Sequence, residues 1–105
     1  MAPIHRRWVF ECDAALDHFD HRLRNALEKR GLALGRARVF DASVVGPGAR
    51  AWYRLEPDAK GVALVAKVKG GVFASATPAA KALAESILAA GREAQAAILQ
   101  GDERA

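Results

Sequence analysis

The feature that most constrains the fold of this 105-residue chain is the change in hydrophobic period along the sequence. Residues 6–12 alternate apolar with polar side chains and are rich in β-formers, which predicts a strand. From residue 14 to residue 30 the apolar side chains recur at spacings of three and four, which predicts an amphipathic helix. Between residues 36 and 69 the strand-like pattern returns, and a second helical pattern runs from 78 to about 100. This sequence of patterns predicts an α+β domain.

Turn residues divide the middle of the chain into three predicted strands. The first covers residues 36–45 and ends at the glycine and proline cluster of residues 46–48. The second covers 51–55 and is broken by the segment 57–61, after which the third runs from 62 to 69. Their spacing is typical of an antiparallel meander.

Cap residues set the ends of the two predicted helices. Asp13 is expected to be the N-cap of the first helix, and Gly31 follows its last turn. Thr77 is expected to cap the second helix, with Pro78 at its first position, where the missing N–H costs nothing. Gly91 falls in the middle of this helix, which implies close packing or a bend at that point.

The predicted architecture is a two-layer β-α-β-β-β-α sandwich, with two helices packed on one face of a four-stranded sheet. All 105 residues belong to a single domain, and residues 1–5 and 101–105 are expected to fray. The strand period of two gives the sheet one apolar face and one basic face. The expected basic positions are Arg36, Arg38, Arg54, Lys67 and Lys69, with Trp52 on the face of Arg54.

Composition narrows the class of protein. Hydrophobic residues make up 51% of the chain, too many for a disordered protein, and no apolar run is long enough to span a membrane. The N-terminal residues lack the apolar core of a signal peptide, and Cys12 is the only cysteine, so the expected compartment is the cytoplasm. No motif predicts an enzyme, a cofactor or a catalytic residue, and Cys12 is interpreted as a small buried hydrophobic residue rather than a nucleophile.

Positive charge is concentrated in the middle of the sequence. The whole chain has a net charge of +4, whereas residues 22–69 hold eleven basic and four acidic residues, a net charge of +7. Such an excess favours a polyanionic partner, because each phosphate contact releases condensed counterions. The alternative interpretation is a charged surface that serves solubility.

Four segments carry a resemblance to a known family. They are KVKGGVFASA at 67–76, ALAE at 82–85 in the second helix, DAALDHF at 13–19 and GRARV at 35–39. Together with the predicted order of elements, these segments resemble the family of ribosome hibernation-promoting factors and ribosome-associated inhibitors. The likeness is one of pattern and extends over most of residues 8–100.

The resemblance implies a non-enzymatic factor that binds ribosomal RNA of the small subunit. Such a factor occupies the decoding channel and blocks messenger and transfer RNA during stasis. Because the sequence stops soon after the second helix, the resemblance implies a short-form member of the family. The family usually carries several basic residues in the latter half of this helix, whereas residues 89–100 contain only Arg92.

Seven basic residues form the candidate RNA-binding set, because phosphate contacts require long cationic side chains in one field rather than a strict spacing. They are Arg22, Lys29, Arg36, Arg38, Arg54, Lys67 and Lys69. Arg22 and Lys29 share a face of the first helix, and the others can share a face of the sheet. Trp52 can stack on an exposed base or can be a packing residue.

The first helix also contains the run DHFDH at 17–21. His18 and His21 are spaced to reach one metal ion, but a site needs further ligands, so no metal is predicted. Together with Asp17 and Asp20 they are interpreted as a solvent-facing edge, where the helix dipole favours the two carboxylates.

Two other functions stay open at this point. A small protein-interaction or self-assembly module, and with it a homo-oligomer, would suit the low charge of residues 70–91 and the alanine-rich second helix. A more general RNA-binding domain is the other alternative, because the double-stranded RNA-binding domain shares the α-β-β-β-α part of the order. That domain usually has a basic opening to its last helix, where this chain has Lys81 alone.

Overall fold

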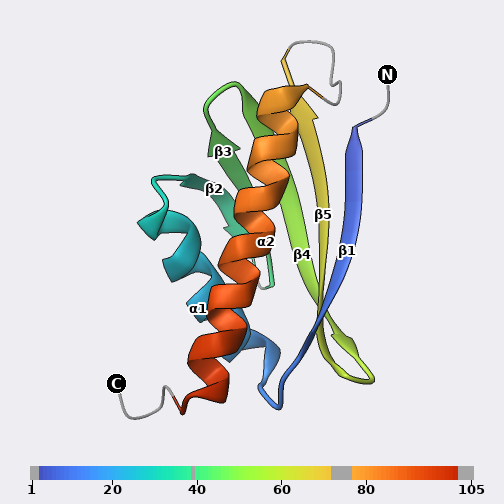
Figure 1. The fold of residues 1–105 in the computed structure, drawn as a ribbon, viewed down its shortest axis with the longest axis vertical. Helices are drawn as coiled ribbons and strands as arrows, with labels where there is room; N and C mark the ends of the chain where they lie inside the picture. The colour runs from blue at the N-terminus through green and yellow to red at the C-terminus, as the bar shows by residue number, and fades with distance from the viewer. Residues whose placement is uncertain (1–2, 39, 72–76, 102–105) are drawn as a thin grey trace.

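The chain folds into five strands and two helices over residues 3–38, 40–71 and 77–101, the part that the computed structural model describes, without the side chains of residues 36 and 37 (Figure 1). Residues 72–76, which lead into the predicted second helix, lie outside the described ranges. The elements are β1 (Ile4–Glu11), α1 (Leu16–Lys29), β2 (Ala33–Arg38), β3 (Asp41–Gly46), β4 (Ala49–Asp58), β5 (Gly61–Gly70) and α2 (Pro78–Leu99).

The sheet has five strands rather than the predicted four, because the segment predicted as one strand over 36–45 is a hairpin of β2 and β3. The chain reverses at Phe40, whose φ of 67° lies in the left-handed region. This conformation normally favours Gly or Asn, so a phenylalanine gives no turn signal in the sequence. Phe40 is partly buried and packs against the core, which offsets the unfavourable backbone conformation.

The strand order across the sheet is β1-β5-β4-β3-β2, and every neighbouring pair is antiparallel. The first strand therefore pairs with the last, with Ile4 opposite Val68 and Glu11 opposite Gly61. After β1, helix α1 carries the chain from one edge of the sheet to the other, where β2 begins the meander.

Both helices pack on the same face of the sheet, as the sequence predicts, and they also pack against each other (Figure 1). Helix α2 crosses β5, β1 and β4, whereas α1 lies over β2 and β4. The core between the layers contains Phe19, Leu23, Tyr53, Leu64 and Ile87, all fully buried.

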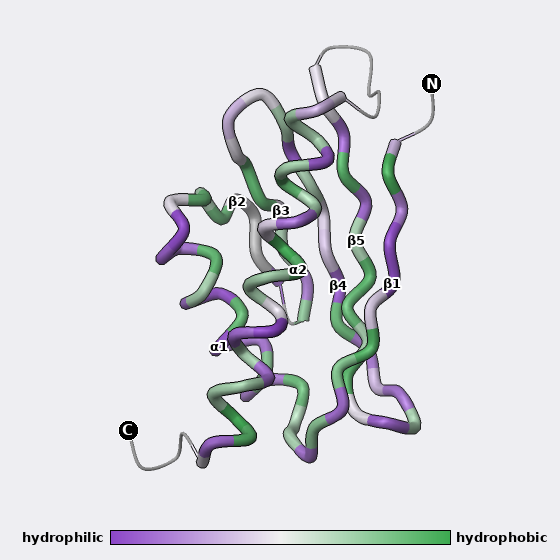
Figure 2. The backbone as a smooth tube through the Cα atoms, in the orientation of Figure 1, coloured by the Kyte–Doolittle hydropathy of each residue, from purple (hydrophilic) through white to green (hydrophobic). Residues whose placement is uncertain are grey.

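The predicted alternation holds along β4 and in the second half of β5, whereas residues 62–66 of β5 are all apolar (Figure 2). In β4, Tyr53 and Leu55 are buried and Arg54 is exposed. In β5, Val68 is buried and Lys67 is exposed. One face of the sheet is apolar and covered by helices, and the opposite face carries the charged side chains.

Both strands of the β4–β5 hairpin are longer than predicted. β4 continues through Pro57 to Asp58 instead of ending at Leu55. The Leu55 N–H donates to the Phe40 carbonyl on the β3 side, so the nitrogen of Pro57, two residues on, faces the same side and away from β5. β3 pairs with β4 only as far as Arg54, and Pro57 therefore removes no bond from the sheet.

The helix ends agree with the prediction at Thr77, Pro78 and Gly31 and differ at Asp13. Thr77 accepts a hydrogen bond from the Ala80 N–H at 3.2 Å and caps α2, and Gly31 follows α1 with a φ of 78°. The prediction for Asp13 is wrong, because α1 begins later and Ala15 is its N-cap, without a side-chain bond. At Gly91, an added Cβ would lie 2.5 Å from Cζ of Phe10, so close packing explains this glycine.

The N-terminal residues also differ from expectation. The sequence predicts fraying over residues 1–5, whereas β1 begins at Ile4, which is buried opposite Val68. Residues 1–2 and 102–105 lie outside the described ranges.

Candidate nucleic-acid interface

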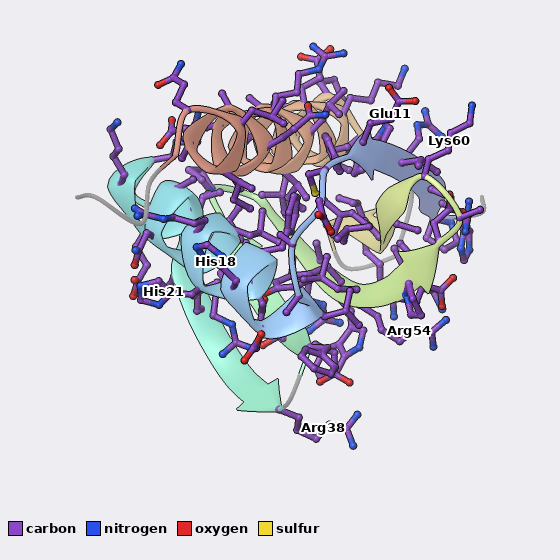
Figure 3. All side chains as sticks on the ribbon, turned by 90° about the horizontal axis from the view of Figure 1, so that it is seen from below. Glu11, His18, His21, Arg38, Arg54 and Lys60 are labelled. Carbon is purple, nitrogen blue, oxygen red and sulfur yellow. The ribbon has the colours of Figure 1, made fainter. Side chains whose placement is uncertain are left out.

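The candidate site lies on the face of the sheet opposite the helices, here called the open face. No described residue of α1 or α2 packs on this face, because both helices cover the other one. Viewed along the sheet, Arg38 and Arg54 extend away from α2 on the opposite side of the molecule (Figure 3). The strand alternation places six basic residues on the open face: Arg7, Arg38, Arg50, Arg54, Lys67 and Lys69.

At the end of the open face near the β4–β5 turn, positive charge is neutralised by acids. Arg7 lies 3.0 Å from Asp58 and 3.7 Å from Glu56, and Arg54 lies 3.1 Å from Glu56. The backbone N–H of Lys60 and the guanidinium of Arg7 lower the pKa of Asp58. These two arginines and two carboxylates form an ion-pair network, which leaves little net positive charge to attract an anionic ligand.

At the opposite end of the open face, near the β3–β4 turn, three cations lie beside Trp52. Arg50 is paired across the strands with Lys69, and Trp52 with Lys67. Within the described residues, no acidic side chain forms an ion pair with Arg50, Lys67 or Lys69. We call Arg50, Trp52, Lys67 and Lys69 the basic cluster; it is the part of the open face with an unneutralised positive field.

The basic cluster lines a shallow depression of about 640 Å³. The lining of the depression is partly apolar, with Val45 and the half-buried ring of Trp52. The depression is lined by Ser43, Val45, Arg50, Ala51, Trp52, Lys67 and Lys69. A surface of this kind is suited to a ligand that combines a flat apolar part with negative charge.

Arg38 reaches the same ring from β2. Its guanidinium carbon lies 5.7 Å from the centre of the Trp52 ring, within the range of a cation–π contact. Its Nε also lies 3.3 Å from a carboxylate oxygen of Asp41, so its charge is partly neutralised. Arg38 therefore contributes more to holding the indole ring than to the free positive field.

A buried cluster beneath the sheet holds the backbone from which Arg38 projects. Arg24 of α1 donates to the carbonyl oxygens of Arg38 at 2.8 Å and Asp41 at 3.3 Å, on either side of the β2–β3 turn. The same guanidinium lies 2.8 Å from Asp20, which accepts a 2.7 Å hydrogen bond from the Tyr53 hydroxyl. Two hydrogen bonds thus tie α1 to the end of the β2–β3 hairpin, a third ties it to Tyr53 of β4, and the salt bridge joins two residues within α1.

The prediction that Asp20 lies on a solvent-facing edge is wrong, since it is only 7% exposed. Its spacing of three and seven residues from Leu23 and Leu27 places it on the apolar stripe of α1, and this spacing is the signal that the prediction missed. Burial and the neighbouring Asp20 carboxylate raise the pKa of Tyr53. Burial lowers the pKa of Arg24, but Asp20 outweighs this effect, and the net shift is upward. Tyr53 is therefore a neutral donor and Arg24 a cation at any physiological pH.

The predicted set of seven basic residues does not form one surface. Arg38, Arg54, Lys67 and Lys69 share the open face, whereas Arg22 and Lys29 belong to α1, on the helical side of the sheet. Lys29 also lies 3.5 Å from Glu93 of α2.

Arg36 and Arg50 are the two other basic residues in which the structure and the predicted set are to be compared. Arg36 lies where the β2–β3 register shifts between Leu34 and Ala37, which interrupts the period of two, and its side chain lies outside the described residues. The prediction omits Arg50, although its alternation with Trp52 and Arg54 in β4 was a readable signal.

The remaining candidates from the sequence are the two histidines of α1 and Cys12. His18 and His21 both belong to α1, and Nε2 of His21 lies 3.4 Å from the amide nitrogen of Asn25 (Figure 3). Among the described side chains, no group of three or more His, Cys, Asp and Glu residues is placed to hold a metal ion. Partial burial and the charge of Asp13 raise the pKa of the Cys12 thiol, which disfavours the nucleophilic thiolate.

Over the ranges that the structure covers, neither helix is both long and apolar enough to cross a membrane. Searches against protein-family models, curated proteins and solved structures found no match to this chain.

Proposed function

We propose that the protein is a non-enzymatic RNA-binding factor that contacts RNA phosphates through the basic cluster. The observation that carries the proposal is the division of the open face into an ion-paired end and an unneutralised end. Three cations at the second end lie beside an aromatic ring, and within the described residues no acid pairs with them. When such cations contact phosphates, the RNA releases condensed counterions, and this release is the main source of affinity for RNA.

The target that we propose is ribosomal RNA of the small subunit. This part of the proposal is supported by the resemblance of the sequence segments to the hibernation factors, together with the +7 charge of residues 22–69. The mechanism is stoichiometric: the domain docks on phosphates in the cytoplasm and its bulk excludes messenger and transfer RNA during stasis. The 43 × 27 × 22 Å dimensions give it the bulk for such steric occlusion.

The test compares two charge-reversed variants of equal net charge in sedimentation with small ribosomal subunits. Lys67→Glu/Lys69→Glu changes the open face, and Lys81→Glu/Arg92→Glu changes exposed residues of α2 on the helical side. We expect the first variant to bind at least about tenfold more weakly than the second, because only the first removes phosphate contacts. Thermal melting of both variants checks that each remains folded.

Salt dependence tests the electrostatic basis of the binding. With about three phosphate contacts, the logarithm of the binding constant should fall with the logarithm of salt concentration at a slope of about −2 on single-stranded RNA. A wild-type protein that fails to sediment with subunits at low ionic strength contradicts the ribosomal target. Equal binding by the two charge-reversed variants contradicts the assignment of the surface.

A second candidate function, self-assembly, is favoured by the edge of the sheet. Within the described residues, the eight-residue strand β1 pairs only with β5, so its other edge presents unpaired backbone groups. Such an edge can pair with a strand of another chain. Size-exclusion chromatography with light scattering tests this alternative: a dimer that persists at high salt, without affinity for RNA, would favour it over the RNA-binding function.

A further inference from the structure

We propose that the basic cluster accepts an unpaired nucleotide whose base stacks on Trp52, so that the protein prefers single-stranded to double-stranded RNA. This inference rests on the proposed function and specifies the chemical class of its ligand.

Trp52 occupies the middle of a row of residues that crosses four strands of the open face. Ser43 of β3, Trp52 of β4, Lys67 of β5 and His5 of β1 are paired in register along this row. The indole is half-buried and lies on the face opposite the helices, outside the hydrophobic core that they cover. An aromatic ring in this position offers a large apolar surface to a ligand on a rigid strand.

The depression around Trp52 matches the two chemical parts of a nucleotide. Its volume of about 640 Å³ lies within the usual range of small-ligand sites, roughly 300–1,000 Å³. Val45 and Trp52 provide apolar surface for a base, and the three cations of the basic cluster provide charge for phosphates beside it. Along β4, Arg50 and Trp52 are two residues apart, a separation of about 7 Å that allows one ligand to reach both.

Double-stranded RNA cannot use the aromatic part of this site. Within a duplex each base face, apart from those of the terminal pairs, is covered by its neighbours, and the protein meets phosphates and 2′-hydroxyls instead. A duplex can therefore contact Arg50, Lys67 and Lys69 but cannot stack on Trp52. An unpaired base can do both, and Arg38, whose guanidinium carbon lies 5.7 Å from the ring centre, supplies a further group able to stack with it.

The experiment measures the affinity of the full chain for two labelled RNAs by fluorescence anisotropy. One is a single strand, and the other is a blunt duplex that contains the same strand. Trp52→Ala should weaken binding of the single strand by about 5- to 150-fold and binding of the duplex by less than about twofold. Trp52→Phe, which keeps an aromatic ring, should restore most of the single-strand affinity.

A second readout comes from the indole itself. In a Trp8→Phe background, Trp52 is the one remaining tryptophan, and single-stranded RNA should quench its fluorescence while the duplex leaves it largely unchanged. Lys67→Glu/Lys69→Glu should weaken the binding of both RNAs, because both depend on phosphate contacts.

The outcomes separate this inference from the proposed function. If Trp52→Ala weakens the binding of both RNAs equally, or of neither, the stacking inference is overturned. If Lys67→Glu/Lys69→Glu then weakens the binding of both RNAs, RNA binding by the basic cluster is still supported. If the lysine variant leaves both affinities unchanged, the proposed function fails. If a free mononucleotide binds as tightly as the single strand, the ligand is a free nucleotide and the preference for an RNA strand is overturned.

Discussion

Two aspartates one helical turn apart in α1 have different roles, which only the structure separates. Asp17 is exposed in the first turn, where its carboxylate accepts a hydrogen bond from the His18 N–H. Asp20 is buried between Tyr53 and Arg24. Removing the Asp20 carboxylate leaves a buried hydroxyl and a largely buried guanidinium without their partner, which is costly in free energy.

We predict that Asp20→Ala lowers the free energy of unfolding by about 2–4 kcal/mol. Asp17→Ala should lower it by only about 0.5 kcal/mol, through the loss of a charge favoured by the helix dipole. Urea denaturation of both variants measures the difference. Equal effects of the two substitutions would contradict the structural role given to Asp20.

The packing of α2 against β1 depends on the absence of a side chain at Gly91. A Cβ at this position would meet three atoms of the Phe10 ring, the closest at 2.5 Å. Phe10 is buried and also contacts Phe19, with 5.6 Å between the ring centres, so its ring has little freedom to move. The sequence shows a glycine in a helix, which by intrinsic propensity alone is unfavourable, and only the position of β1 explains it.

We predict that Gly91→Ala destabilises the protein by about 1–2 kcal/mol, as overpacking outweighs the gain of about 1 kcal/mol in helix propensity. In a Phe10→Leu background, with a smaller side chain at the contact, the same substitution should cost less. Chemical denaturation of the four proteins in this cycle gives the coupling between the two sites. A variant that gains about 1 kcal/mol of stability would show that the helix can move away from β1 freely.

The β2–β3 hairpin shows why the number of strands could not be predicted from this sequence. Residues 36–45 contain no Gly, Pro or Asn, and the turn is made at Phe40 with a positive φ. The alternation in β4 and β5 was predictable because each strand has one covered and one open face. Periodicity places Asp20 on the apolar side of α1, but its pairing with Tyr53 and the shift in register of β2 depend on contacts between distant segments, which periodicity does not encode.

The distribution of charge over the whole molecule also depends on strand register. The sequence predicts a basic sheet face, and the open face is indeed rich in Arg and Lys. The sequence could not show that Arg7 meets Asp58, 51 residues away, whereas Lys67 and Lys69 meet no acid among the described residues. The pairing of β1 with β5 beside β4 neutralises one end of the face and leaves the other end charged.

The stability of the whole molecule should depend on pH through Glu93, which joins the two helices. The Arg30 guanidinium at 3.0 Å and the Lys29 ammonium at 3.5 Å lower the pKa of Glu93 from its ordinary value of 4.5. Because the folded pKa is the lower one, the stabilisation is fully present above the unfolded value and is lost as the pH falls through the folded value.

We therefore predict that Glu93→Gln lowers the free energy of unfolding by about 0.5 kcal/mol at pH 7, a small effect because the carboxylate is partly solvent-screened. The difference from the wild type should shrink as the pH falls below about 4.5 and should disappear below the folded pKa of Glu93. Glu85→Gln, on the same helix and without an ion pair in the described structure, is the control. Urea denaturation between pH 3 and pH 7 measures both, and a constant difference across this range would contradict the ion pair.

The pairing of β1 with β5 also determines when the protein can fold during its synthesis. Ile4 is synthesised 64 residues before its partner Val68. Until β5 has emerged, the nascent chain can form α1 and local hairpins, whereas β1 has no strand to pair with. Contacts of such high sequence separation slow folding and keep apolar segments accessible to chaperones until β5 has emerged. The sheet is therefore completed only after β5 has emerged, and β1 remains without its partner strand until then.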